Sequence, residues 1–124
     1  MLFRSLQISA AYVPPPPTGF VSPVTWGQED AVRERFGAAG IGHDAITCER
    51  ATYTFRHAGP PREFLAIFRD FYGPTMNAFE AAERAGRRQD LQAELEQLFE
   101  SENRGGPSRT EIPATYLKVV VVRK

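Results

Sequence analysis

The sequence predicts one domain of the α/β class, in which helices precede and separate two strands. Residues 45–56 and 113–122 are rich in threonine, valine and aromatic residues, which favour strands. Between these segments, apolar residues recur every three or four positions, as they do in amphipathic helices. A chain of 124 residues can bury a core of its own but is too short for a second full domain.

Two helices are expected before the first strand. Residues 3–13 are weakly amphipathic and are stopped by Pro14, so this segment reads as the tail of a helix whose beginning is missing. Residues 28–36 carry two acidic residues near the positive end of a second helix, and Val32 and Phe36 lie four apart on its buried face.

Three helices are expected between the strands. Pro60-Pro61 opens the first, and Gly73-Pro74 ends it and begins the second. The third runs from about residue 87 to residue 103 and is ended by a Gly-Gly-Pro sequence.

The last strand contains four consecutive valines, Val119–Val122, which predicts a strand covered on both faces. The chain offers one other good strand, and a sheet of two strands is marginal by itself. The sequence therefore indicates a partial domain, whose further strands come either from an upstream segment or from a second subunit.

The stretch Tyr12–Gly27 reads YVPPPPTGFVSPVTWG and can be interpreted as a docking ligand or as a packed loop. Polyproline ligands usually lie in disordered, polar surroundings. Here predicted structure flanks the prolines closely, and Phe20, Val24 and Trp26 provide apolar anchors. The composition therefore favours the packed loop.

Composition excludes several classes of function. Fifteen basic and fifteen acidic residues cancel, which disfavours binding to nucleic acid or to an anionic membrane by charge alone. The one cysteine, Cys48, cannot form an internal disulfide or a thiolate metal site, and its place in an alternating segment favours a small buried hydrophobe. No signal peptide and no run of about 18 apolar residues is present. We expect a cytoplasmic protein.

No catalytic, cofactor-binding or metal-binding residue can be assigned from motifs. Gly40-Ile41-Gly42 precedes a strand, whereas a dinucleotide-binding loop follows one, so it predicts a turn. His43 and His57 lack the spacing of a ligand pair. The corner Tyr72-Gly73-Pro74 is open to two interpretations: its aromatics overhang a pocket, or they belong to the core, as an aromatic stripe usually does.

Taken in order, these segments resemble the C-terminal portion of class I S-adenosylmethionine-dependent methyltransferases, in particular the group related to the ubiquinone and menaquinone enzymes. The resemblance covers essentially the whole chain. Its most specific parts are the PPPP…SP…WG stretch and the FYGPT corner; the closing PATYLKVVVVRK also fits.

The resemblance implies a Rossmann-like methyltransferase fold in which the two strands, the sixth and seventh of seven, run antiparallel. It also implies that the cofactor-binding half is absent, because the glycine-rich loop and the acidic residue that hold S-adenosylmethionine have no counterpart in the sequence. The remaining substrate-side part implies Trp26, Phe71 and Tyr72 as residues that line the pocket of a small organic acceptor.

We therefore expect a methyltransferase fragment that is inactive alone, binds no S-adenosylmethionine by itself and can self-associate through exposed strand edges. The alternative is a noncatalytic interaction module that completes its sheet by dimerising. The sequence does not identify the acceptor or the methylated atom.

Overall fold

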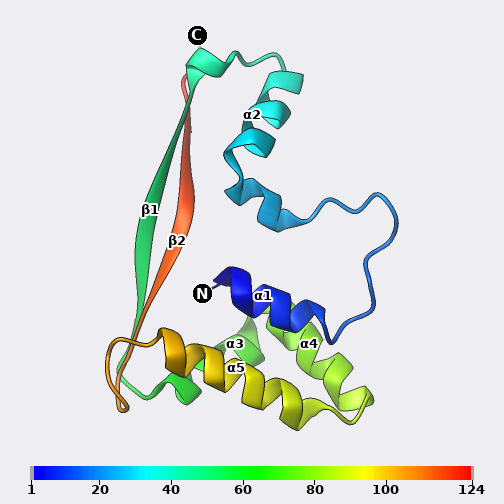
Figure 1. The fold of residues 1–124 in the computed structure, drawn as a ribbon, viewed down its shortest axis with the longest axis vertical. Helices are drawn as coiled ribbons and strands as arrows, with labels where there is room; N and C mark the ends of the chain where they lie inside the picture. Colours follow the sequence, from blue (N-terminus) through cyan, green and yellow to red (C-terminus); the bar gives the residue numbers. More distant parts are fainter. Residues whose placement is uncertain (1, 124) are drawn as a thin grey trace. The chain divides into compact units, whose positions relative to one another are not determined.

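A computed structural model describes residues 2–123 and has the mixed α/β architecture that the sequence predicts (Figure 1). Its described part contains five α-helices and a two-stranded antiparallel sheet. The elements, in order, are α1 (Leu2–Ala10), α2 (Glu29–Ala38), β1 (Ile46–His57), α3 (Pro61–Phe71), α4 (Gly73–Arg84), α5 (Arg88–Glu102) and β2 (Thr110–Val121), with short 3-10 helices at Pro23–Gly27 and His43–Ala45.

The chain divides into two compact units. The first, which we call the helical unit, comprises Met1–Pro16 and Thr54–Ala114 and holds α1, α3, α4 and α5. The second, the ribbon unit, comprises Pro17–Tyr53 and Thr115–Lys124 and holds α2, most of β1 and the C-terminal part of β2. Each unit is described by itself below.

The register of the sheet follows from one hydrogen bond and the equal lengths of the strands. The Val122 N–H donates to the Ala45 carbonyl at 2.9 Å, and each strand has 12 residues. Ile46 therefore lies opposite Val121, and the pairing continues to His57 opposite Thr110. In this register, odd-numbered residues of β1 and even-numbered residues of β2 exchange hydrogen bonds between the strands.

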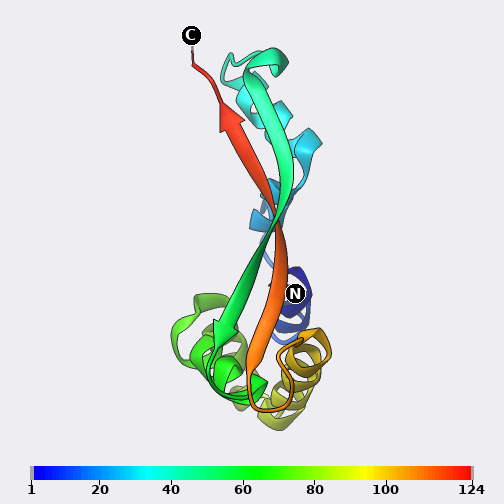
Figure 2. The same cartoon turned by 90° about the vertical axis from the view of Figure 1, so that its left-hand side faces the viewer.

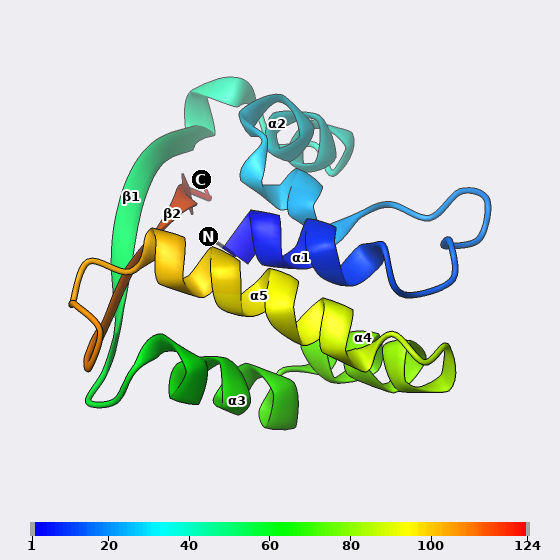
Figure 3. The same ribbon diagram turned by 60° about the horizontal axis from the view of Figure 1, so that its bottom comes forward.

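The core of the helical unit is built by the facing stripes of its helices. In Figure 3, α5 runs beside α1 and α3, and it contacts α1, α3 and α4. Phe99 of α5 is 1% exposed, and its ring lies 5.8 Å from that of Phe64 and 5.4 Å from that of Phe68. Aromatic pairs at these distances add to the free energy gained by burying their area. Ile112 of β2 completes this core from the strand side.

A single side chain fixes the connection from α5 to β2. The Asn103 Oδ1 accepts hydrogen bonds from the N–H groups of Gly105 and Glu111, and its Nδ2 donates to the carbonyls of Gly106 and Arg109. The side-chain amide of Asn103 therefore uses its donors and acceptors within the loop of residues 103–111.

The ribbon unit has a smaller core. Its fully or almost fully buried apolar residues among those described are Val32 of α2 and Ile46 of β1. Arg33 ties these two elements together, because its Nη1 donates to the carbonyls of His43 and Ile46 while its Nη2 forms an ion pair with Glu29 at 3.0 Å.

The observed strands lie close to the predicted bounds of 45–56 and 113–122, and the antiparallel arrangement is confirmed. β2 begins three residues earlier than predicted, at Thr110, because Pro113 does not interrupt it. Pro113 occupies a position whose N–H would point away from β1, so the proline removes no hydrogen bond of the sheet.

Two expectations about coverage are not met within the chain. The valine run is not covered on both faces, since Val120 is 45% exposed and Val122 is 59% exposed. The four prolines of residues 14–17 and the expected anchor Phe20 are exposed as well, and Cys48 is half-buried rather than buried. The valine run and the proline loop therefore lack the covering neighbours that the sequence pattern led us to expect.

Candidate functional site

Trp26, the first of the three residues expected at the acceptor pocket, lies in the ribbon unit just before α2. Its ring is half exposed, and it packs edge-on against Phe36 with the ring centroids 6.4 Å apart. The Arg35 guanidinium lies over the ring, 4.4 Å from its centroid, and also donates a hydrogen bond to the Thr25 hydroxyl. This cation–π contact fixes the orientation of the tryptophan and leaves part of its surface open to a ligand.

Phe71 and Tyr72, the other two expected residues, lie at the corner between α3 and α4 in the helical unit. Phe71 is 81% exposed, the most exposed of the large apolar side chains described. Tyr72 is half-buried and packs against Phe68 with a ring distance of 5.3 Å. Tyr72 thus joins the border of the core and Phe71 does not, and the interpretation that the corner overhangs a pocket stays a prediction.

The three expected residues are divided between the two units. Phe71 and Tyr72 are adjacent in one unit, and Trp26 belongs to the other. Their common role at a pocket stays a prediction, which the geometry of either unit by itself does not test.

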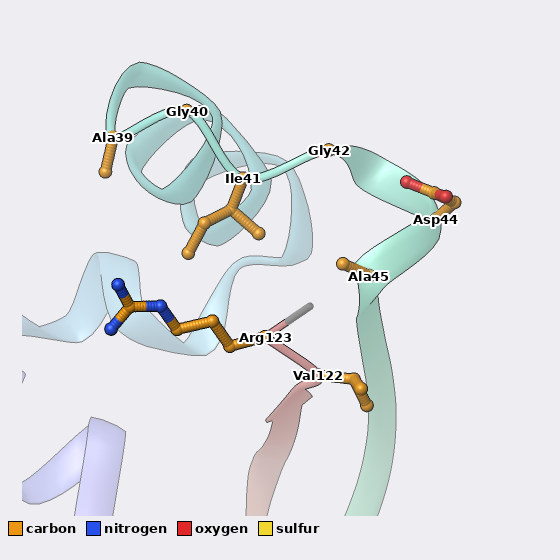
Figure 4. Close-up of a pocket in the computed structure, with 8 residues that line it drawn as sticks. All are labelled: Ala39, Gly40, Ile41, Gly42, Asp44, Ala45, Val122 and Arg123. Carbon is orange, nitrogen blue, oxygen red and sulfur yellow. The ribbon is translucent and has the colours of Figure 1, made fainter.

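The ribbon unit also contains a cavity of about 490 Å³ beside the loop Gly40–Gly42 (Figure 4). Its lining includes Ile41, Asp44 and the side chain of Arg123. The loop is the C-terminal turn of α2: the N–H groups of Gly40 and Ile41 donate to the carbonyls of Gly37 and Phe36. These amides are not free to bind a phosphate, which agrees with the turn predicted for this sequence.

A second cavity, of about 540 Å³, lies on the helical unit between charged side chains of α3, α4 and α5. Each of its three arginines has an acidic partner: Arg69 pairs with Asp70, Arg84 with Glu80 and Arg88 with Glu83. The hydrogen bond from Arg69 holds the pKa of the Asp70 carboxyl below its ordinary value. Because these charges cancel in pairs, the cavity offers no surplus charge for an ionic ligand.

A third cluster joins α1 to α5 in the helical unit. The Tyr12 hydroxyl donates a hydrogen bond to the Glu94 carboxylate, and the Arg87 guanidinium lies 4.4 Å from the centre of the Tyr12 ring. The hydrogen bond to Glu94, burial and the charge of the same carboxylate raise the pKa of Tyr12. Neither this cluster nor the Trp26–Arg35 contact could be predicted from the sequence, because the partners follow no local spacing.

Within residues 2–123, histidine, cysteine and carboxylate side chains nowhere gather in a group of three that could hold a metal ion. None of the described helices combines the length and the apolar composition that a membrane crossing requires.

Comparison with models of protein families, with curated proteins and with solved structures finds no match to this chain.

Proposed function

We propose that the chain is the C-terminal, substrate-side part of a cytoplasmic class I methyltransferase that transfers a methyl group from S-adenosylmethionine to a small organic acceptor. The sequence resemblance described above supports this proposal, above all the PPPP…SP…WG stretch and the FYGPT corner.

The observation that carries the proposal is the exposure of apolar side chains on β2. The second half of β2 has apolar side chains on both faces, yet on one face Tyr116 and Val120, and Val122 directly after the strand, are each 45% to 59% exposed. A strand of this composition is typical of the interior of a larger sheet. In the proposed enzyme, the cofactor-binding half supplies that cover.

The residues that the resemblance implies at the acceptor site are aromatic. Trp26, held by Arg35, and the exposed Phe71 beside Tyr72 provide apolar surfaces that can exclude water around an acceptor and orient it for in-line transfer. The cofactor half supplies the glycine-rich loop and the acidic residue for S-adenosylmethionine, for which this sequence has no counterpart.

Calorimetric titration with S-adenosylmethionine tests the proposal. The 124-residue chain alone should release no binding heat, whereas a fusion of the chain to the polypeptide encoded directly upstream of it should bind the cofactor. Micromolar binding by the chain alone would contradict the proposal, as would an upstream reading frame that encodes no strand followed by a glycine-rich loop.

The second candidate is a noncatalytic interaction module that completes its sheet by dimerising. It is favoured by the exposed apolar face of the ribbon, because two copies can bury Tyr116 and Val120 against each other. Light scattering separates the two: a discrete symmetric dimer supports the module, and heterogeneous association supports the methyltransferase part.

A further inference from the structure

The outer edge of β2 is the side that faces away from β1. Its first half, residues 110–114, and its second half, residues 115–121, differ in whether the backbone N–H and C=O groups on this edge are free to pair with another strand. In the observed register, the odd-numbered residues of β2 direct their N–H and C=O groups away from β1. The hydrogen bonds of Glu111 confirm this orientation, because its N–H donates to Asn103 Oδ1 at 2.7 Å and its carbonyl accepts from the Arg104 N–H at 2.8 Å.

In its first half, the outer edge of β2 is closed. Both outward groups of Glu111 are used by the loop that follows α5, and Pro113, the next outward residue, has no N–H to offer. Another strand cannot pair with this part of the edge without displacing the loop. Such closure is a common protection of edge strands.

In its second half, the same edge is open. The outward groups of Thr115, Leu117, Val119 and Val121 make no hydrogen bond to any other described residue outside the sheet. Figure 2 shows the C-terminal end of β2, in red, at the border of the ribbon. Lys118 is the single charged residue between Ile112 and Val122.

The outer edge of β1 is protected by different means. The outward groups of Ile46 are both used, by the His43 carbonyl and by Arg33. Arg50 and Arg56, two further outward positions, carry charged side chains, which natural edge strands use to discourage pairing. Of the two edges, the second half of β2 is therefore the one suited to accept a strand.

A second copy of β2 fits this edge poorly. The symmetric antiparallel register that uses all of residues 115–121 is centred on Lys118 and places Lys118 opposite its own copy in a non-hydrogen-bonded pair, where Cα atoms are about 4.5 Å apart. Like charges directly opposite each other destabilise a sheet. A register centred on Leu117 places Pro113 opposite Val121, where the proline has no N–H for the ladder. A register centred on Val119 is shorter, because its pairs within β2 end at Leu117 opposite Val121.

We infer that residues 115–121 of β2 bind an extended segment of a different sequence by strand addition, and that this segment carries an acidic residue opposite Lys118. Its side chains beside Leu117, Val119 and Val121 are apolar, because these residues are themselves apolar and half-buried. The pairing ends at Pro113. This inference is independent of the cofactor chemistry, and it holds whether or not the methyltransferase proposal is correct.

A pair of model peptides tests the inference on the full chain. Each is a seven-residue capped peptide of alternating threonine and valine, with glutamate at the centre of one and lysine at the centre of the other. We expect the glutamate peptide to bind about five- to tenfold more tightly at low salt, and to protect the amides of residues 115, 117, 119 and 121 from hydrogen exchange. The preference should reverse in Lys118→Glu and shrink in high salt.

Two proline variants provide the matched control. Val119→Pro removes an outward N–H of β2, and Thr52→Pro removes an outward N–H of β1; neither breaks a bond between the two strands. Val119→Pro should abolish peptide binding, whereas Thr52→Pro should leave it unchanged, with circular dichroism to confirm that both variants fold. Equal binding of the two peptides, no binding of either, or protection along β1 would overturn the inference.

Discussion

The buried apolar side chains described in the helical unit come from three helices and a strand, and they include Phe99, Leu65 and Leu95, each 1% exposed. In the ribbon unit, by contrast, Val32 and Ile46 are the described apolar residues that reach full or nearly full burial. Both units expose large apolar side chains, but the ribbon unit exposes Val21, Trp26, Tyr53 and Val120 beside this small core. Apolar area that is not buried contributes nothing to stability, so the ribbon unit is the part of the molecule that gains most from a partner.

This difference leads us to expect two unfolding transitions in place of one. Trp26 is the single tryptophan and lies in the ribbon unit, so its fluorescence reports that unit, whereas the far-ultraviolet circular dichroism comes mainly from the helices of the other. The fluorescence transition should occur at lower urea than the dichroism transition, since parts with fewer buried contacts open first.

The largest effect is expected for Phe99→Ala in the helical core. Removing this ring leaves a cavity beside Phe64 and Phe68 and should lower the free energy of unfolding, measured by dichroism in urea, by about 3–5 kcal/mol. The control Phe71→Ala removes the same side chain from an 81% exposed position and should cost less than about 0.5 kcal/mol. Similar losses in the two variants would show that the helical core is not where the structure places it.

Two glycines, one in each unit, allow the stability of the two units to be tested separately with substitutions of smaller expected effect. Gly40 follows α2 with φ of 85°, and Gly86 follows α4 with φ of 68°; a Cβ at either position would meet no atom within 4 Å. Alanine at either site is therefore strained only by its backbone, at a cost of about 1 kcal/mol. Gly40→Ala should shift the fluorescence transition alone, and Gly86→Ala the dichroism transition.

If either substitution shifted both transitions equally, the two units would unfold as one. The comparison between them would then describe packing density and not independent stability.

The sequence predicted the helices and strands well because each has its own local signal. The apolar stripes of α3 and α5, the prolines that open α3 and α4, and the β-branched residues of β2 need no distant partner to be interpreted. The early start of β2 was missed because a proline normally ends a strand, and its tolerance at position 113 depends on the register with β1.

The candidate site was predicted less completely, because its contacts join residues that follow no period. Arg35 lies nine residues after Trp26, and Asn103 closes the β2 edge eight residues ahead through a loop. The exposure of the valine run could not be predicted either, since a sequence shows that a strand is apolar but not whether the chain contains what covers it.

The smallest effect that we expect is a pH dependence confined to the helical unit. The pKa of Tyr12 is raised in the folded protein because its hydroxyl donates to the Glu94 carboxylate. The contribution of this hydrogen bond to the free energy of unfolding is therefore fully present below the pKa of tyrosine in the unfolded chain, about 10. It is lost as the pH rises through the higher pKa of the folded protein. Tyr12→Phe should be less stable than the wild type by about 0.5 kcal/mol at pH 8, a small figure because the pair is exposed to solvent.

That stability difference should shrink in the dichroism transition as the pH rises through the raised pKa of Tyr12, and the fluorescence transition of the ribbon unit should not change with it. In Glu94→Gln the amide oxygen still accepts the hydrogen bond but carries no charge, so the pKa of Tyr12 should fall back towards its ordinary value and the loss should begin at lower pH. A difference between wild type and Tyr12→Phe that stays constant from about pH 8 to well above the ordinary pKa of tyrosine would mean that the phenol joins α1 to α5 by packing under Arg87, and not by its bond to Glu94.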